Sequence, residues 1–364
     1  MPSKDIHLEP FDKGTIAKLE MFEAYAQEWI PTVVLHGFPE IHIFDFFSGP
    51  GYDAEKIAGS SIRVLEKIDS FLGQIFQKKT KITLHFNEYD SKKYQLLQKN
   101  CEDFLEEHPK FKHFAQINYY NQDAGELFFE LLPAMDKYPS LVFLDQNGIK
   151  FISKEYITAL EKLNTLDFLY YVSSSYFKRL GLTDEFKRVL DFDPEELEKT
   201  SQKLMHRAVL GKIESRLPKS TDLKLFPYSI KKGPNIYGII FGAKHFRAVD
   251  KFLRIAWSTN QINGEANFDI DDDQKKGQLD MFDGQKMTKI ESFQHELEEK
   301  LLNGELKSNK DVLLFTFERG HIPKHTQPVF KKLKTRIQYE GIAPKVNYDN
   351  VFKKKVIVEY SIKE

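Results

Sequence analysis

Four acidic residues each follow an apolar run, where a strand would end, and could bind a ligand there. Asp45 stands between the mostly apolar residues 41–44 and a turn that contains Gly49 and Gly51. Glycine allows bare backbone to approach a ligand, because no Cβ obstructs it. The other three acids are Glu88, Asp123 and Asp145. Since the carboxyl ends of parallel strands share one edge of an open α/β sheet, we expect these residues to form one site.

An acidic strand end followed by a glycine turn is typical of doubly wound enzymes that bind S-adenosylmethionine. The turn would approach the cofactor, and Glu88 would accept hydrogen bonds from the ribose hydroxyls. Asp123 would meet the adenine amino group, and Asp145 would lie where the methyl group is delivered. A nicotinamide cofactor is disfavoured, because Ala54 replaces the third glycine of that fingerprint, although alanine can substitute there. Acids and glycines also gather at strand ends simply because chains turn there.

Alternating apolar strands and amphipathic helices predict the sheet that positions these acids. The expected strands are 41–47, 81–88, 115–120, 140–145 and 166–172, and the expected helices include 15–30, 60–76, 91–106 and 243–257. Pro31 is expected to end the first helix. Apolar runs at 223–230 and 236–241 flank a Lys-Lys-Gly-Pro-Asn turn, which predicts an antiparallel hairpin. The fold class is therefore α/β: a Rossmann-like doubly wound sheet that ends in an antiparallel hairpin.

Changes in composition divide the chain into domains. We expect an N-terminal helix at 1–38, a Rossmann domain at 39–258 with a charged helical insertion at 176–222, an acidic linker at 259–286, and a winged helix-turn-helix domain at 287–364. The insertion either selects the substrate or is a solvated addition. Residues 263–285 hold seven acids and two lysines, whereas residues 320–364 hold ten Lys or Arg and four acids. The two regions therefore suit different partners.

The composition fits a soluble globular protein. The 364 residues are 41% apolar and 29% charged, which is enough for a full α/β core and one further small domain. The chain has neither a run of eighteen apolar residues nor the apolar segment of a secretory signal, so we expect a cytoplasmic protein without a membrane partner. Its one cysteine, Cys101, excludes an internal disulfide framework and is expected to pack on a helix.

The basic tail predicts a DNA-binding surface. Helices are expected at 290–302 and 310–317, a basic helix at 326–336, and strands at 337–339 and 355–360. The cations that would contact phosphates are Lys324, Lys331, Lys332, Lys334 and Arg336 on the helix, and Lys353, Lys354 and Lys355 on the wing. A winged helix can also bind protein, so the fold alone does not decide the partner.

A short peptide in the acidic linker resembles the one by which bacterial replication and repair proteins dock onto the sliding clamp. It consists of Gln278, Leu279, Asp280, Met281 and Phe282. The three apolar side chains stand in a charged context and gain little unless a pocket receives them, while the glutamine could orient the peptide at the pocket rim. The alternative is that they fold back onto the Rossmann domain.

Several motifs together resemble the three-Cys-motif partner protein (TcmP) family. They are Phe44–Gly51, Asn87-Glu88, Leu144–Gly148, Phe177–Arg179, Tyr237–Gly242 and Lys251–Trp257. The resemblance covers residues 15–260. It implies a class I S-adenosylmethionine methyltransferase-like domain in bacteria or their mobile elements. It also implies a separate partner with three cysteines, of the radical S-adenosylmethionine type.

The residues after the fourth strand limit the reaction. Cytosine-5 methylation needs a cysteine nucleophile there, but Cys101 lies earlier in the chain. Amine methylation usually relies on Asp or Asn, two prolines and an aromatic residue, whereas this chain has Asp145-Gln146-Asn147-Gly148. That tetrapeptide also departs from the Asp-Pro-aromatic-Gly form of the family. Asp145 could still accept from an amine, and Phe151 could stack on a base. A methyltransferase acting on or at DNA and a non-catalytic DNA-binding adaptor that recruits its partner both stay open.

Overall fold

The computed structural model describes residues 9–146, 150–172, 177, 180–181, 183–190, 192–233, 235–276 and 287–363. The chain divides into two compact units, Met1–His245 and Phe246–Glu364. The tetrapeptide residues Asn147 and Gly148, the pair Lys178-Arg179 and the clamp-like peptide Gln278, Leu279, Met281 and Phe282 lie outside the described residues. Among the described helices, none is long and apolar enough to cross a membrane.

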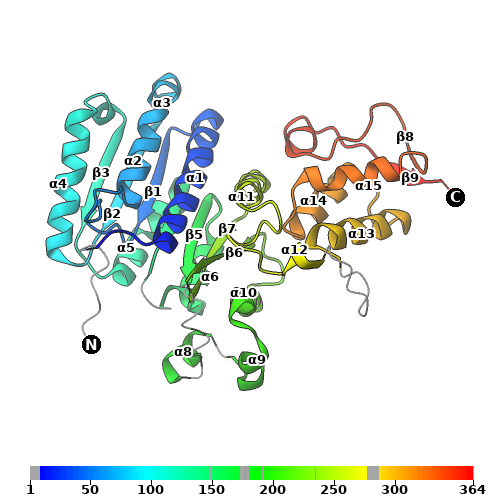
Figure 1. Cartoon of the computed structure of the whole chain (residues 1–364). Helices are drawn as coiled ribbons and strands as arrows, with labels where there is room; N and C mark the ends of the chain where they lie inside the picture. The colour runs from blue at the N-terminus through cyan, green and yellow to red at the C-terminus, as the bar shows by residue number, and fades with distance from the viewer. Residues whose placement is uncertain are drawn as a thin grey trace. The chain divides into compact units, whose positions relative to one another are not determined.

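A seven-stranded sheet in the order β3-β2-β1-β4-β5-β7-β6 forms the N-terminal unit (Figure 1). The strands are β1 Glu40–Asp45, β2 Lys81–Asn87, β3 Ala115–Tyr120, β4 Ser140–Leu144, β5 Leu166–Val172, β6 Lys224–Lys232 and β7 Asn235–Ala243. The first five are parallel, and β7 is antiparallel to both β5 and β6. This confirms the predicted doubly wound sheet with its antiparallel hairpin. The strand order reverses between β1 and β4, which places a ligand site at their carboxyl ends.

Helices cover both faces of the sheet. They are α1 Lys13–His36, α2 Ser60–Ser70, α3 Leu72–Lys78, α4 Ser91–Glu107, α5 Ala124–Lys137 and α6 Lys154–Lys162, with short 3-10 turns at Phe111–His113 and Lys150–Ile152. On one face, α5 and α6 share a buried cluster with Phe44 and Val142. On the other face, Phe22 of α1 stacks on Phe143 of β4 with ring centroids 4.3 Å apart. The end of β1 is therefore enclosed between α1 and α5.

The first helix does not end at Pro31, as the sequence predicted, but continues to His36. Proline inside a helix costs a backbone hydrogen bond. Here burial outweighs that cost, because Ile30 and Val34 on either side are fully buried. The helix ends at Gly37, whose φ of 93° is in the left-handed region that glycine adopts without strain.

The insertion between β5 and β6 is helical, as the sequence predicted. Its helices are α8 Asp184–Val189, α9 Pro194–Lys199, the 3-10 turn Gln202–Leu204 and α10 Met205–Glu214. Phe186, Leu190 and Phe192 are buried in the same cluster as α5 and α6. This part of the insertion is therefore packed into the N-terminal unit and is not merely a solvated addition.

The C-terminal unit contains a helix-turn-helix followed by a wing. Its elements are α11 Phe246–Thr259, α12 Asp273–Lys276, α13 Lys289–Leu302, α14 Asn309–Glu318, a 3-10 turn Pro323–Thr326, α15 Gln327–Lys332, β8 Ile337–Tyr339, the π-helix Asp349–Lys353 and β9 Tyr360–Ile362. Strands β8 and β9 pair antiparallel, and a bridge between Ser308 and Glu359 adds a third short segment. The wing is the segment 340–359 between β8 and β9.

Two of the predicted elements in this unit were wrong in extent. The basic helix predicted at 326–336 ends at Lys332, because the chain then turns so that Leu333 and Ile337 both enter the core. The strand predicted at 355–360 begins only at Tyr360. Lys355 has a φ of 55°, which an extended strand cannot contain.

Part of the predicted linker is folded. Asn263 is fully buried, and its Oδ1 accepts hydrogen bonds from the N–H groups of Glu265 and Ala266. Gly264 has a φ of 57°, and a Cβ there would lie 2.3 Å from the ring of Trp257. Residues 260–276 and α11 therefore group with the C-terminal unit, whereas the sequence assigned α11 to the Rossmann domain. The other predicted boundaries stay predictions.

Candidate functional site

The turn after β1 needs its glycines. Gly49 and Gly51 have φ values of 61° and 92°, in the left-handed region. A Cβ on Gly51 would also lie 3.3 Å from Cβ of Asn100. The turn is held in shape because Asn100 Nδ2 donates to the Pro50 carbonyl at 2.7 Å and the Gly59 N–H donates to the Gly51 carbonyl at 2.7 Å. The backbone at this turn is therefore preformed.

Asp53 organises the rest of this loop and was not singled out from the sequence. Its buried carboxylate accepts hydrogen bonds from the N–H groups of Phe11 (2.6 Å), Glu55 (2.9 Å) and Ile57 (2.8 Å). The bonds to Glu55 and Ile57 form the local turn that aspartate favours, which is a signal available in sequence. The bond to Phe11 ties the segment before α1 to the loop, and that contact depends on the tertiary structure.

Asp45 is buried at the end of β1. Its Oδ2 accepts a hydrogen bond from Ser60 Oγ at 2.5 Å, and its Oδ1 accepts one from the Phe47 N–H at 3.1 Å. Burial, helped by the negative charge of Asp145, raises the pKa of Asp45 to about 7 despite these hydrogen bonds. Asp45 therefore joins the glycine turn to the start of α2 and can change its charge near neutral pH.

Glu88 comes directly after β2 and reaches the glycine turn. Burial raises the pKa of Glu88, while hydrogen bonds from the N–H groups of Asp90 and Gly49 lower it in part. Its neighbour Asn87 is buried, and the Asn87 side chain bonds to the backbone of Phe46 and of Gln122. The loops that follow β1, β2 and β3 are thereby joined at one edge, as the sequence predicted for parallel strands.

Asp123 lies at the same edge of the sheet, but its carboxylate already has structural hydrogen-bond partners. Its Oδ1 accepts hydrogen bonds from the N–H groups of Gly125 (2.9 Å) and Glu126 (3.2 Å), so it caps the start of α5. Lys150 Nζ lies 3.2 Å from the same oxygen. A Cβ on Gly125 would lie 2.3 Å from that ammonium, so a larger residue at 125 would displace the Lys150 side chain. The assignment of Asp123 to adenine stays a prediction.

Asp145 follows β4 and pairs with a lysine that was not among the predicted site residues. Lys18 of α1 forms an ion pair with Asp145 Oδ2, and the two side chains are only 7% and 20% exposed. The Lys18 ammonium also lies 4.5 Å from the centre of the Tyr171 ring. Lys18 is four residues before Phe22 and seven before Tyr25, within the buried stripe of the helix. A lysine within an otherwise apolar helical stripe is the sequence feature that would have marked Lys18 as a candidate site residue.

Gln146 and Phe151, the described residues next after Asp145 that could shape a base-stacking platform, do not form one. Gln146 stands where a proline was expected, and it is buried, with its Oε1 accepting from the Phe151 N–H at 3.0 Å. Phe151 is only 3% exposed and packs against Phe47, with ring centroids 5.5 Å apart. The hypothesis that Phe151 stacks on a base is therefore wrong, because its ring is part of the core.

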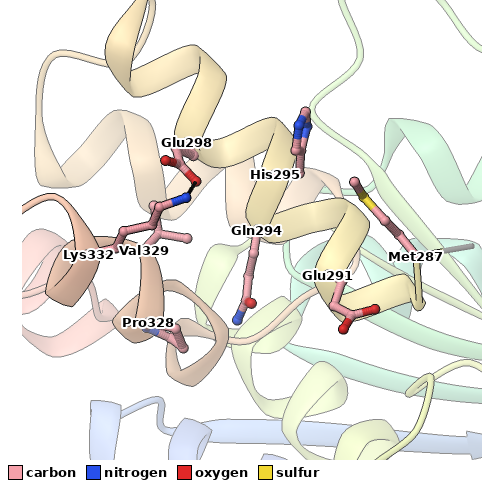
Figure 2. Close-up of a pocket in the computed structure, with 8 residues that line it drawn as sticks. All are labelled: Met287, Glu291, Gln294, His295, Glu298, Pro328, Val329 and Lys332. Carbon is pink, nitrogen blue, oxygen red and sulfur yellow. Dashed lines mark hydrogen bonds and ion pairs between the residues drawn. The ribbon is translucent and has the colours of Figure 1, made fainter. Parts of the chain in front are cut away.

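The predicted phosphate contacts in the C-terminal unit are all exposed, but they are not equivalent. They are Lys324, Lys331, Lys332, Lys334, Arg336, Lys353, Lys354 and Lys355. Lys332 lies 2.7 Å from Glu298 of α13. Beside this pair is a cavity of about 360 Å³ between α13 and α15, lined by Met287, Glu291, Gln294, His295, Glu298, Pro328, Val329 and Lys332 (Figure 2). Its two glutamates make this flank of α15 unfavourable for a phosphate backbone.

The wing is held in place from two sides. The buried Asn309 at the start of α14 donates from Nδ2 to the carbonyls of Lys345 and Val356, and its Oδ1 accepts from the Val358 N–H. On the other side, Phe352 stacks on Phe246 of α11 with ring centroids 5.1 Å apart. The lysines at 353–355 follow directly and are presented by an ordered segment.

Comparison with known proteins supports the winged helix. Residues 268–340 match the model of a family described as the GMT-like wHTH domain. None of the curated proteins matches the chain. Among solved structures, the chain is similar to the O-methyltransferase TomG from Streptomyces achromogenes in complex with SAM, at 12% identity and a TM-score of 0.33, over 64% of this chain and 90% of that one.

A second solved structure, Trm1 from Pyrococcus horikoshii with S-adenosyl-L-methionine, is similar at 14% identity and a TM-score of 0.37, over 67% of this chain and 59% of that one. A likeness at this level carries no inference about the ligand or the reaction of this chain. Those have to be argued from its own side chains.

Proposed function

We propose that the N-terminal unit binds S-adenosylmethionine at the ends of β1, β2 and β4, and that the chain is a methyltransferase-like protein acting on or at DNA. The observation that carries the proposal is that the Gly49 N–H and the Glu88 carboxylate meet from two different strand ends. In dinucleotide folds, a carboxylate beside a glycine turn binds the ribose while the turn admits the adjoining group. Asp45, Asp145 and the Lys18 that pairs with Asp145 together carry one net negative charge when both carboxylates are ionised, which suits a cationic sulfonium.

Each site residue has a role in this proposal. Glu88 accepts from the ribose hydroxyls, and the preformed turn at Gly49 and Gly51 lies against the cofactor. The Tyr89 ring, which is 74% exposed directly after Glu88, offers a face on which adenine can stack. Asp45 supplies charge beside the sulfonium, and Asp145 faces the acceptor. The cofactor supplies the methyl group, and these residues bind and orient it.

The C-terminal unit supplies the DNA contact in this proposal. Exposed cations on α15 and on the wing suit neutralisation of phosphates, which gives affinity that falls with salt. The cavity flank with its glutamates would face away from the duplex. The lysines Lys331 and Lys334 are the strongest candidates on α15, because Lys332 already has an acidic partner.

Two protein partners belong to the proposal. The family resemblance implies a three-Cys-motif protein, and the peptide around Leu279 implies the bacterial sliding clamp. A peptide spanning residues 274–286 should bind purified clamp in a titration. If changing both Leu279 and Phe282 to alanine leaves that binding unaltered, the clamp assignment is wrong.

Calorimetry with S-adenosylmethionine tests the cofactor. The unaltered chain should bind, Glu88→Ala should bind at least tenfold more weakly, and Glu106→Gln, an exposed acid on α4, should bind as the unaltered chain does. An unaltered chain that gives no heat removes the cofactor proposal. Transfer of a labelled methyl group to DNA, with and without the three-Cys protein, then tests the reaction.

A second candidate function is a non-catalytic adaptor that places its partner on DNA. It is favoured by two observations at the acceptor position: Lys18 already pairs with Asp145, and the Phe151 ring is buried. An adaptor would bind DNA and partner normally when Asp145 is changed to asparagine. A loss of labelled methyl transfer in Asp145→Asn, with DNA binding intact, would favour the enzyme.

A further inference from the structure

Lys18 is a buried lysine that points to the end of β4. Its side chain is 7% exposed, and it forms an ion pair with Asp145. Taking an ammonium out of water costs several kcal/mol, and an apolar residue of similar volume often serves stability as well as a buried ion pair does. Packing alone therefore does not account for a lysine at this position.

The helix that carries Lys18 is fixed on both sides of it. At the start of α1, Asp12 forms an ion pair with Lys232 of β6. One turn after Lys18, Phe22 stacks on Phe143, and Tyr25 then donates from its hydroxyl to Asp167 Oδ2 at 2.7 Å. The ammonium is also attracted to the face of the Tyr171 ring. Lys18 is therefore held at the end of the sheet.

One member of this ion pair acts on Asp45, because the negative charge of Asp145 raises the pKa of Asp45. The charged and titratable groups that act on Asp45 include Asp145, which follows β4, and Cys101 of α4, and Lys18 of α1 is paired with Asp145. Without Lys18, the repulsion between these two carboxylates at adjacent strand ends would be stronger, which favours the protonated form of Asp45. With Lys18, the three groups carry one net negative charge when both carboxylates are ionised. S-adenosylmethionine carries one net positive charge.

We propose that Lys18 is a positioning residue of the cofactor site, which holds the Asp145 carboxylate at the end of β4 and offsets part of its charge toward Asp45. The site then offers a single negative charge to a cationic ligand. The identity of that ligand rests on the proposed function, whereas the effect of Lys18 on Asp45 does not.

Carbon-13 NMR of the aspartate carboxyl groups, without cofactor, tests the effect directly. The Asp45 signal is assigned from its loss in Asp45→Asn, and its midpoint in the unaltered chain is expected near pH 7. Lys18→Met should raise that midpoint by about one pH unit, because the Lys18 ammonium no longer offsets the charge of Asp145. Lys18→Arg should leave it unchanged, and Asp145→Asn should lower it.

Lys18→Met alone leaves a buried unpaired carboxylate and can fail to fold. The double variant Lys18→Met with Asp145→Asn buries no unpaired charge and serves in that case. Its Asp45 midpoint should lie above that of Asp145→Asn, since the field of the Lys18 ammonium is then gone. Equal midpoints for these two variants, or for Lys18→Met and the unaltered chain, overturn the proposal.

Binding of S-adenosylmethionine from pH 6 to 9 separates this inference from the proposed function. Affinity should rise as Asp45 ionises, and in Lys18→Met that rise should move to higher pH together with the NMR midpoint. An unaltered chain that does not bind removes the proposed function and leaves the NMR result standing. If the unaltered chain binds S-adenosylmethionine but the Asp45 midpoint does not move in Lys18→Met, the inference is wrong and the proposed function stands.

Discussion

Asn87 Nδ2 donates a hydrogen bond to the Phe46 carbonyl at 3.1 Å, so the last side chain of β2 holds the turn that follows β1. The same side chain also bonds to the backbone of Gln122 after β3. These bonds are made by a residue that is 2% exposed, where an unmade bond is costly. The position of Gly49 relative to Glu88 therefore depends on the Asn87 side chain, although these hydrogen bonds do not involve either residue.

Asn87→Ala should loosen that edge. It leaves the backbone groups at Phe46 and Gln122 without their partner, which should destabilise the N-terminal unit by about 1–3 kcal/mol. Urea unfolding measures the stability, and calorimetry should show weaker binding of S-adenosylmethionine. Asn87→Asp restores the acceptor but not the donor, so it should recover only part of the loss. Cofactor affinity that is unaffected in a clearly destabilised Asn87→Ala would show that this amide has no part in the site.

The stability of the chain should depend on the ionisation of Asp167. Burial raises the pKa of this carboxyl to about 7, whereas an unfolded aspartate titrates near 3.9. Between these values the folded chain holds a proton that the unfolded chain has lost. The contribution of Asp167 is therefore fully present below about pH 4 and is lost as the pH rises through 7.

Asp167→Asn keeps an acceptor for the Tyr25 hydroxyl and cannot ionise. Its stability relative to the unaltered chain should increase from pH 4 to 7 by roughly 2–4 kcal/mol and level off above 7. Urea unfolding at pH 4.5, 6 and 8 measures the difference. Burial lowers the pKa of His85 to about 3, so the contribution of His85 to stability changes with pH in the opposite direction. That contribution is the same in both chains and does not affect the difference between them. A difference that is constant with pH would contradict the shift at Asp167.

The lysines of α15 should differ in their effect on DNA binding. Lys331→Gln should weaken binding and reduce the slope of log affinity against log salt by about one, as expected for one lost phosphate contact. Lys332→Gln should have a smaller effect, because Lys332 already pairs with Glu298. Glu298→Gln should strengthen binding. Fluorescence anisotropy over a salt series measures all three, and equal slopes for Lys331→Gln and Lys332→Gln would contradict the assignment.

Asn309→Ala should free the wing. It removes three hydrogen bonds, to the backbone of Lys345, Val356 and Val358, from a fully buried side chain. Amide hydrogen exchange across the wing should accelerate, and DNA affinity should fall because Lys353 and its neighbours lose their fixed position. Lys310→Gln, the exposed next residue of α14, serves as the control for exchange. Exchange that accelerates no more in Asn309→Ala than in this control would mean that the wing is held by other contacts.

Local sequence was sufficient to predict most of the sheet and its edge. The strands at 115–120 and 166–172 have the predicted bounds, because apolar runs between turn residues leave few other conformations. The placement of Asp45 and Glu88 at the same edge of the sheet follows for the same reason, since the parallel strands β1 and β2 end there. The end of α1 and the start of β9 were mispredicted. In α1 the burial of Ile30 and Val34 outweighs a proline, and Lys355 adopts a left-handed backbone that its residue type does not signal.

The sequence by itself determined which acids, glycines and lysines stand at strand and helix ends, because the periods of helices and strands are local properties. Only the tertiary structure decided which of them are paired. Lys18 reaches Asp145, Ser60 reaches Asp45 and Glu298 reaches Lys332 across different elements. The charge of a carboxyl depends on its burial and on these partners, and both are set by packing between segments that are far apart in the chain.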